Sequence, residues 1–241
     1  MTSDVKTPPQ LDFTRFDALT FDCYGTLIDW EAGILSALRP LLEAHDIVDR
    51  DADDLLERHA QLEAEAEEGP FRRYRSILAE VARGFGEDFG FVPTSAQVEG
   101  FAASVAVWPP FEDSTQALKA LETRYRLAIV SNVDDDLFAG SAGQLGIDFS
   151  EVVTAQQVGS YKPAQEHFDE VLRRLELPRS RVLHVAQSLY HDIAPARQLG
   201  FTCVWVNRRV GRPGGGATQP ATAHPDHEVP DLRTLVEQMG L

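Results

Sequence analysis

The chain has 241 residues, of which 43% are hydrophobic, so it is long enough for one large domain or two modest ones with a sizeable core. Its formal net charge of −16 excludes a general nucleic-acid binder, because neutralising phosphates requires clustered Lys and Arg. A small anionic substrate stays compatible with this charge, since one or two cations inside a cleft can outweigh a distant surface field.

The cysteines and the N-terminus indicate where the protein works. Cys23 and Cys203 both lie in apolar, strand-like runs, which is typical of a reduced, cytoplasmic protein, although the sequence also allows a disulfide between them. Residues 1–15 are polar at their start and contain no apolar signal segment, so we expect a short disordered tail. No apolar run approaches the length of a membrane span, and we expect no membrane association.

The stretch from Ala18 to Asp29 predicts a buried strand followed by a tight loop. Apolar and β-branched residues run into Asp22, and Gly25 follows within the loop. Ligands bind at the carboxyl ends of strands in open α/β sheets, so Asp22 would lie at the mouth of a site. The same pattern also fits an ordinary turn with a solvated aspartate.

Helical periodicity then continues through residues 30–109 and predicts four amphipathic helices. Thr94, with Gln97 three residues later, marks the capped start of the fourth. Acidic side chains gather on the second helix, where we expect a solvated face: Glu57, Glu63, Glu65, Glu67 and Glu68.

Strands and helices alternate after residue 110. Buried strands are expected at 127–130, 152–154, 182–185 and 203–206, with helices between them. This alternation predicts an α/β fold with a doubly wound parallel sheet. The core domain would comprise residues 16–29 and 110–241, with residues 30–109 inserted as a helical cap domain that can cover the end of the first strand.

Polar residues stand at the predicted ends of several strands. Ser131 follows the second strand, and Lys162 and Asp192 follow later ones. Each alone has an ordinary structural explanation, since a lone Lys is usually a surface residue and a lone Asp a helix cap. Because parallel strands end at one edge of the sheet, their joint occurrence with Asp22 favours a catalytic site.

These residues resemble the motifs of the haloacid dehalogenase superfamily. The resemblance runs from about residue 16 to the C-terminus. It is carried by the loop Phe21-Asp22-Cys23-Tyr24-Gly25-Thr26-Leu27, by Ser131-Asn132, by Lys162-Pro163 and by Asp192. More narrowly, the chain is similar to the type II (S)-2-haloacid dehalogenases, in which tyrosine stands two residues after the nucleophile. The segments Arg58-His59-Ala60-Gln61-Leu62-Glu63 and Val204-Trp205-Val206-Asn207-Arg208 also match that subfamily.

The resemblance implies hydrolysis of short 2-haloalkanoic acids to 2-hydroxy acids and halide, without a metal or other cofactor, and a possible homodimer. Asp22 would attack the α-carbon and form an ester. Lys162 would pair with Asp22, Ser131 would hold the substrate carboxylate, Arg58 would receive the halide and Asp192 would activate water. Further substrate contacts are expected from Tyr24, Thr26, Asn132, Phe168, Ser188 and His191.

The residue two places after Asp22 separates this reaction from phosphate hydrolysis. A phosphatase of this superfamily needs a second carboxylic acid there, to protonate the leaving alkoxide and later to activate water. Tyr24 occupies the position, and a phenol with a pKa of about 10 is a poor base near neutral pH. A halide leaves without a proton. Phosphatases of this superfamily also hold Mg²⁺ with paired acids in the fourth motif, whereas here Ala186-Gln187-Ser188 precede Asp192.

Two other functions stay open on the sequence: a Mg²⁺-dependent phosphatase acting on a small phosphate monoester, and a non-catalytic binding protein. The chain departs from the subfamily at Phe168, where a tyrosine is expected, and in the segment Ala186-Gln187-Ser188. Arg58 would otherwise be a solvent-facing helix residue, and His191 a packing or surface residue.

Overall fold

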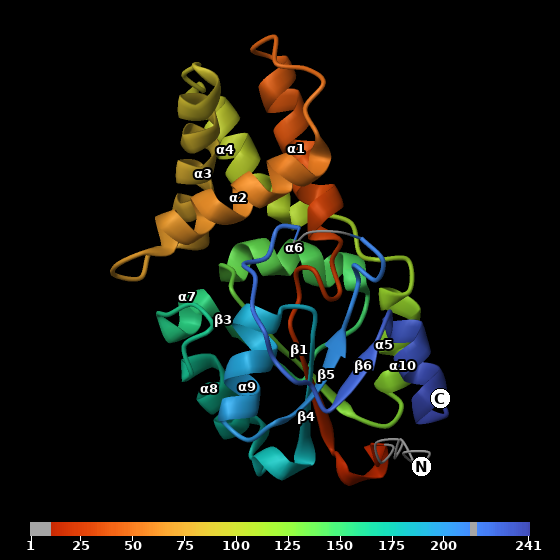
Figure 1. The fold of residues 1–241 in the computed structure, drawn as a ribbon. Helices are drawn as coiled ribbons and strands as arrows, with labels where there is room; N and C mark the ends of the chain where they lie inside the picture. Colours follow the sequence, from red (N-terminus) through yellow and green to blue (C-terminus); the bar gives the residue numbers. More distant parts are fainter. Residues whose placement is uncertain (1–10, 213–215) are drawn as a thin grey trace, which may run out of the picture.

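Six parallel strands form the central sheet of the computed structural model, which describes residues 11–212 and 216–241. Their order is β3-β2-β1-β4-β5-β6, so the chain winds outward from β1 in both directions and confirms the doubly wound sheet (Figure 1). The strands are β1 (Ala18–Phe21), β2 (Arg126–Ser131), β3 (Glu151–Thr154), β4 (Val182–Ala186), β5 (Thr202–Val206) and β6 (His227–Val229). β6 was not anticipated, since its three residues contain one apolar side chain.

Alternating side chains of the strands feed two hydrophobic clusters, one on each face of the sheet. On β1, Leu19 and Phe21 belong to one cluster and Ala18 to the other, as the two-residue repeat of a strand requires. The first face is covered by α5 (Ser114–Leu121), α6 (Asp135–Leu145) and α10 (Leu232–Met239). The second face is covered by α8 (Glu166–Leu175) and α9 (Ala194–Gln198).

Shorter segments complete this layer. They are η1 (Phe13–Arg15), α7 (Ala155–Val158), η3 (Arg179–Arg181) and η4 (Leu189–Ile193), the last being a π-helix that runs directly into α9. The expected tail of residues 1–15 is described only from residue 11; residues 1–10 lie outside the described residues. Phe13 is buried against the core, so order begins earlier than we expected.

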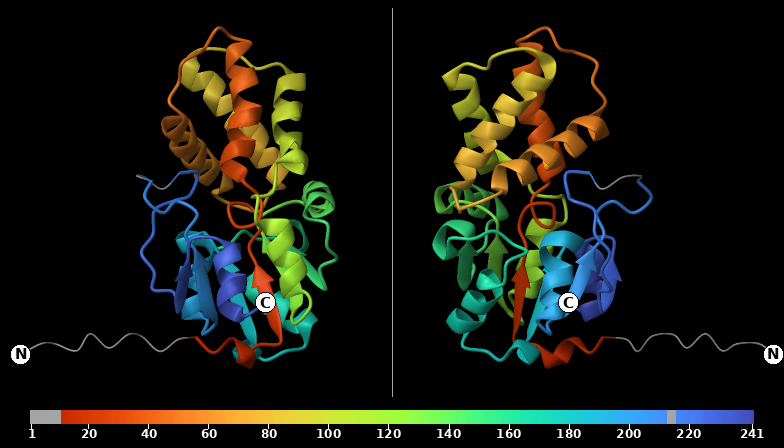
Figure 2. Two further views of the ribbon diagram at one scale, coloured as in Figure 1. Left: turned by 90° about the vertical axis from the view of Figure 1, so that its right-hand side faces the viewer. Right: turned by 60° about the vertical axis from the view of Figure 1, so that its left-hand side comes forward.

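A separate group of helices, here called the helical block (residues 30–107), lies beyond the carboxyl ends of the strands (Figures 1 and 2). It consists of α1 (Trp30–Glu43), α2 (Ala52–Glu67), α3 (Tyr74–Phe89), α4 (Ser95–Ala103) and η2 (Ser104–Val107). The chain enters and leaves it side by side, where the Asp29 N–H donates to the Pro109 carbonyl at 2.8 Å. α4 begins with the predicted capping box of Thr94 and Gln97.

In the described part of the chain, no helix combines the length and the apolar character needed to cross a bilayer.

Candidate active site

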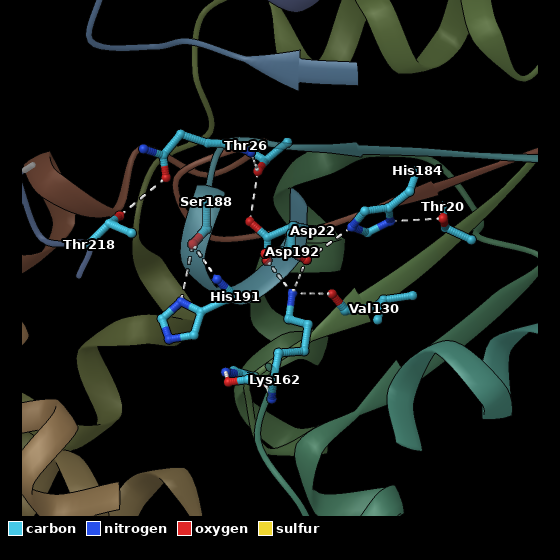
Figure 3. Close-up of polar contacts among 12 residues, drawn as sticks. Thr20, Asp22, Thr26, Val130, Lys162, His184, Ser188, His191, Asp192 and Thr218 are labelled. Atoms are coloured by element: carbon cyan, nitrogen blue, oxygen red, sulfur yellow. Dashed lines mark hydrogen bonds and ion pairs between the residues drawn. The ribbon is translucent and has the colours of Figure 1, made fainter. Parts of the chain in front are cut away.

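Asp22 lies directly after β1, in the loop that leads into the helical block. Asp22 is 6% exposed, and its N–H donates to the Val185 carbonyl of the neighbouring strand at 3.2 Å. Thr26 Oγ1 donates to Asp22 Oδ2 at 2.7 Å and fixes the carboxylate (Figure 3). Gly25 permits this turn because its φ is +88° and a Cβ there would lie 2.9 Å from Trp30 Nε1.

Lys162 joins Asp22 to a second carboxylate. Its Nζ lies 2.9 Å from Asp22 Oδ1 and 2.7 Å from Asp192 Oδ1, and its third hydrogen bond, of 2.8 Å, goes to the Val130 carbonyl (Figure 3). Asn132 positions the lysine by accepting from the Lys162 N–H at 2.7 Å and donating to its carbonyl at 3.1 Å. All three protons of the ammonium group are therefore used, which suits a lysine that is 1% exposed.

Asp192 lies in η4, and His184 of the neighbouring strand β4 fixes its carboxylate. His184 Nε2 lies 3.0 Å from Asp192 Oδ1, and His184 Nδ1 lies 3.0 Å from Thr20 Oγ1. Burial opposes ionisation of Asp192, but Lys162 and His184 outweigh it and lower the pKa to about 2. The other oxygen, Oδ2, is buried and has no hydrogen-bond partner among the described residues.

The pKa of the Asp22 carboxyl is raised, because burial outweighs the groups that favour its ionised form. Desolvation raises its pKa and the Asp192 charge adds to this rise, whereas Lys162 and the hydrogen bond from Thr26 lower it. Lys162 is thus the group that favours the ionised, nucleophilic form of Asp22.

A small cavity of about 40 Å³ opens above Asp22. A single water needs about 10–15 Å³ of such space, so the cavity has room for a group of a few heavy atoms. Eight residues expected from the sequence line it: Asp22, Tyr24, Ser131, Asn132, Lys162, Ser188, His191 and Asp192. Thr26, the ninth residue that the structure brings to the site, supports Asp22 from the side.

Two of these lining residues have polar groups that suit a ligand. Ser131 Oγ is buried and has no hydrogen-bond partner within the described part of the chain. His191 lies beside Ser188, whose Oγ accepts from the His191 N–H at 2.9 Å, and burial lowers the pKa of its imidazole to about 4. His191 is therefore neutral near pH 7.

Tyr24 is fixed by a 3.0 Å hydrogen bond with Ser141, and burial raises the pKa of its hydroxyl above the ordinary value.

The helical block supplies the rest of the cavity wall, and here the expectation of a solvated acidic face was wrong for part of α2. Glu63 is 8% exposed and accepts a 2.6 Å hydrogen bond from the Tyr74 hydroxyl. Glu63, Glu67, Tyr74 and Trp30 all line the cavity with Asp22. Burial raises the pKa of Glu63 to about 7 and, with added repulsion from Glu63, that of Glu67 to about 9.

Arg58 does not reach the cavity, which corrects its expected role as the halide receptor. Its guanidinium binds both oxygens of Asp88 on α3, with Nε to Oδ2 at 2.6 Å and Nη2 to Oδ1 at 3.0 Å. Glu65 adds a weaker ion pair at 3.6 Å. The face of α2 that carries Arg58 turns toward α3 and solvent, and the face with Glu63 turns toward the site.

Phe168 is also displaced from its expected place. It is 1% exposed and packs in the core behind the sheet, with its ring 5.3 Å from His184 and 5.7 Å from Phe201. It can contribute to the site only through His184, which holds Asp192.

Sequence reasoning missed three lining or supporting residues: Trp30, Tyr74 and His184. Glu63 and Glu67 had been assigned to solvent. The four-residue spacing of Glu63 and Glu67, which places them on one helix face, was the available signal. For His184, the available signal was a titratable side chain within a predicted buried strand.

Few oxygen atoms of the site are left to bind a divalent cation. Both Asp22 oxygens and Asp192 Oδ1 already accept hydrogen bonds, and the Gln187 side-chain oxygen accepts from Thr218 at 3.3 Å. No group of three or more His, Cys, Asp or Glu within the described ranges could hold a metal ion. Among these three side chains, Asp192 Oδ2 is the one oxygen without a partner in the described residues, whereas hard cations take several oxygen ligands.

The parallel sheet and the buried Asp22–Lys162–Asp192 group at its carboxyl edge are the marks of a hydrolase built on an α/β core. The family model for haloacid dehalogenase-like hydrolases matches residues 16–200. The chain therefore belongs to the haloacid dehalogenase-like hydrolase family.

Curated relatives include both dehalogenases and phosphatases. (S)-2-haloacid dehalogenase 2 of Pseudomonas sp. is 30% identical over 129 residues, 52% of this chain and 54% of that protein. Glyceraldehyde 3-phosphate phosphatase of Methanothermobacter thermautotrophicus is 30% identical over 143 residues, 58% of this chain and 62% of that protein. This chain thus spans less than two thirds of the length of either one.

Two longer matches extend the comparison. (S)-2-haloacid dehalogenase H-109 of Pseudomonas putida is 25% identical over 222 residues, which cover 90% of this chain and 94% of that protein. The solved L-2-haloacid dehalogenase of Xanthobacter autotrophicus has a TM-score of 0.77 at 20% identity, covering 93% of this chain and 98% of that one. The structural likeness establishes the fold.

Proposed function

We propose that the protein hydrolyses short 2-haloalkanoic acids, such as haloacetate or (S)-2-halopropionate, to 2-hydroxy acids and halide. The observation that carries this proposal is the buried pairing of Asp22 with Lys162 beside Tyr24, at the floor of a cavity of about 40 Å³. It provides a carboxylate nucleophile, a small substrate space and, two residues after Asp22, a phenol where a phosphatase needs an acid.

In the first step, an Asp22 oxygen attacks the α-carbon from the side opposite the halogen. The carbon–halogen bond breaks with its electron pair leaving on the halide, the configuration inverts, and an ester with Asp22 remains. Ser131 Oγ, which has no partner among the described residues, donates to the substrate carboxylate. Thr26 and Lys162 hold the nucleophile in place.

The halide departs on the side away from Asp22, where the helical block contributes Trp30, Glu67 and Tyr74. Glu67, with a pKa of about 9, keeps its proton near pH 7 and can donate a hydrogen bond to the anion. This replaces the role first expected of Arg58.

In the second step, water attacks the ester carbonyl and releases the 2-hydroxy acid. Asp192 was expected to activate this water, yet a carboxylate with a pKa of about 2 is a weak base. Its Oδ2 atom, which is buried and unpartnered in the described structure, is suited to orienting the water by accepting a hydrogen bond.

The test is a substrate screen with the purified protein in EDTA. Chloro-, bromo- and fluoroacetate and both enantiomers of 2-chloropropionate are supplied, and released halide and hydroxy acid are measured. We expect consumption of the (S)-enantiomer with inverted product and no loss in EDTA. Phosphate release from p-nitrophenyl phosphate that requires added Mg²⁺, without halide release, would instead favour the phosphatase; no turnover of either substrate would favour a binding protein.

A further inference from the structure

We propose that Glu63 of the helical block is the general base that hydrolyses the Asp22 ester. This inference rests on the proposed function and assigns its second step to a residue outside the family motifs seen in the sequence. Glu63 lines the same cavity as Asp22, and its side chain is 8% exposed. A base must reach the water that attacks the ester, and the lining of this cavity limits the candidates.

The other titratable groups around the cavity are poorly matched to this task. Asp192 is bound to Lys162 and has a pKa of about 2, and His191 has a pKa of about 4 because of burial. Both would be weak bases near neutral pH. Glu63, which burial brings to a pKa of about 7, has the strength that general-base catalysis requires at that pH.

Two buried polar atoms indicate that the cavity is built for a ligand rather than for its acids alone. Ser131 Oγ and Asp192 Oδ2 are both fully buried, and neither has a partner among the described residues. Both residues line the same cavity as Glu63. Unsatisfied polar atoms at such a position need a substrate or water to complete their hydrogen bonds.

Water has a route to Glu63. A second pocket of about 400 Å³ lies against the small cavity, and the two share Glu63, Glu67, Lys162 and His191. Glu63 therefore lines both the outer pocket and the inner cavity that contains Asp22.

A hydrogen bond from Tyr74 fixes the orientation of the Glu63 carboxylate. The Tyr74 hydroxyl donates to Glu63 Oε1 at 2.6 Å, which leaves Oε2 for the water. Tyr74 is in turn held by Asp134, which accepts its N–H at 3.1 Å. Tyr74 and Asp134 are positioning residues in this scheme.

The step balances without any added reagent. The Glu63 carboxylate takes a proton as the water oxygen bonds to the ester carbonyl carbon of Asp22. The bond from that carbon to the alkyl oxygen then breaks, and the electron pair goes to the alkoxide of the product. Protonated Glu63 returns its proton to the alkoxide, which leaves Asp22 as a carboxylic acid with one oxygen from water. This acid then loses its remaining proton to solvent, and the Asp22 carboxylate is restored.

Several titratable groups share these cavities with Glu63. They are Tyr74 of α3, Glu67 of α2 and Glu68 directly after it, Asp22, Tyr24, Tyr190, His191 and Asp192 of the core, and Tyr161 and Lys162 of the loop before α8. Burial raises the pKa of both carboxyls, and repulsion from Glu63 raises that of Glu67 further, so the two groups titrate as a pair.

The deciding experiment uses the full chain with Glu63→Gln and chloroacetate. We expect a burst of about one equivalent of halide, an intact-mass increase at Asp22, and steady-state turnover slower by about 10²- to 10⁴-fold. The matched control Glu57→Gln, on the exposed side of α2, should turn over like the wild type. Tyr74→Phe keeps Glu63 but removes a hydrogen bond that lowers its pKa, so the acid limb of steady-state turnover should move to higher pH.

The outcomes separate the two proposals. Steady-state turnover in Glu63→Gln equal to the wild type, or an acid limb that Tyr74→Phe leaves in place, would overturn the role of Glu63 while dehalogenation stands. A wild type that releases no halide from any 2-haloacid would overturn both. If Glu63→Gln fails to fold, the pH profile of Tyr74→Phe decides alone.

Discussion

Asp134 binds the first turn of α3 by accepting the backbone N–H of Tyr74 at 3.1 Å through one oxygen, and that of Arg75 at 3.0 Å through the other. Asp134 follows β2, whereas Tyr74 belongs to the helical block, so this contact joins the two parts of the molecule beside the cavity. A carboxylate at a helix N-terminus is favoured both by the free N–H groups and by the helix dipole. The position of Tyr74, and through it that of Glu63, is therefore set from the edge of the sheet.

Replacing Asp134 with alanine should weaken this join. Its side chain is fully buried, and the change leaves two N–H groups without an acceptor. We expect the free energy of unfolding to fall by about 1–3 kcal/mol, as measured by urea denaturation. Asp136→Ala is the matched control, because Asp136 is half-exposed and forms its ion pair with the Arg75 side chain; it should cost less than about 1 kcal/mol. Equal losses in the two variants would contradict the role given to Asp134.

Lys162→Met tests what keeps Asp22 ionised. Without the ammonium group, burial and the Asp192 charge both raise the pKa of Asp22 with no opposing cation. We expect the halide burst at pH 7 to slow by about 10³-fold or more, and to recover in part as the pH rises through the new pKa of Asp22. The rate of the halide burst is measured by rapid quench at several pH values between about 6 and 10. A burst at pH 7 as fast as that of the wild type would show that Asp22 does not depend on Lys162.

The part of the site that lies on the sheet could be predicted from sequence, because the carboxyl ends of parallel strands must meet. Asp22, Ser131 and Asp192 each follow an apolar run, and the structure brings them to one cavity. Lys162 was placed by the same reasoning. Apolar runs and caps are local signals, so the elements that carry these residues were found with small errors at their ends.

The wall supplied by the helical block could not be predicted in the same way. Periodicity shows which face of α2 is apolar, but a buried polar stripe such as Glu63 and Glu67 has the same pattern as a solvated one. The direction of Arg58 depends on Asp88, thirty residues later on another helix, and no local rule reports that pairing. Which face of α2 turns toward the site therefore depends on tertiary contacts that the local sequence does not report.

Arg58→Ala tests the corrected position of this arginine. Because its guanidinium binds Asp88 and lies outside the cavity, we expect kcat/KM for chloroacetate to stay within about twofold of the wild type. The free energy of unfolding should fall by about 0.5–1 kcal/mol, since a partly exposed ion pair contributes little. Steady-state kinetics and urea denaturation measure the two quantities. A loss of activity of 10²-fold or more, with normal stability, would instead support the originally expected role of Arg58 as the halide receptor.

The pH dependence of stability tests the burial of the two glutamates independently of activity. In the folded protein the pKa of Glu63 is about 7 and that of Glu67 about 9, both above the ordinary value of 4.5. Between pH 4.5 and pH 9 the folded state binds more protons at these two glutamates than the unfolded state does, so their contribution to stability falls as pH rises from about 5 to 9. Buried His191, whose pKa is lowered to about 4, contributes the opposite slope below about pH 6.5, and it does so equally in the wild type and in a glutamate variant. Asp192, whose pKa of about 2 is lowered, contributes the opposite slope only below about pH 4 and leaves this window unaffected.

The variant Glu63→Gln/Glu67→Gln removes both titrations while keeping side chains of the same size. We expect the loss of unfolding free energy between pH 5 and pH 9 to become smaller than in the wild type by roughly 2 kcal/mol or more. Urea denaturation at pH 5, 7 and 9 gives the comparison, with Glu57→Gln/Glu65→Gln as the control on the exposed side of α2. Parallel curves for the wild type and the buried-pair variant would mean that these carboxyls titrate as if in solvent. Glu63 would then lack the raised pKa that fits it to act as a base.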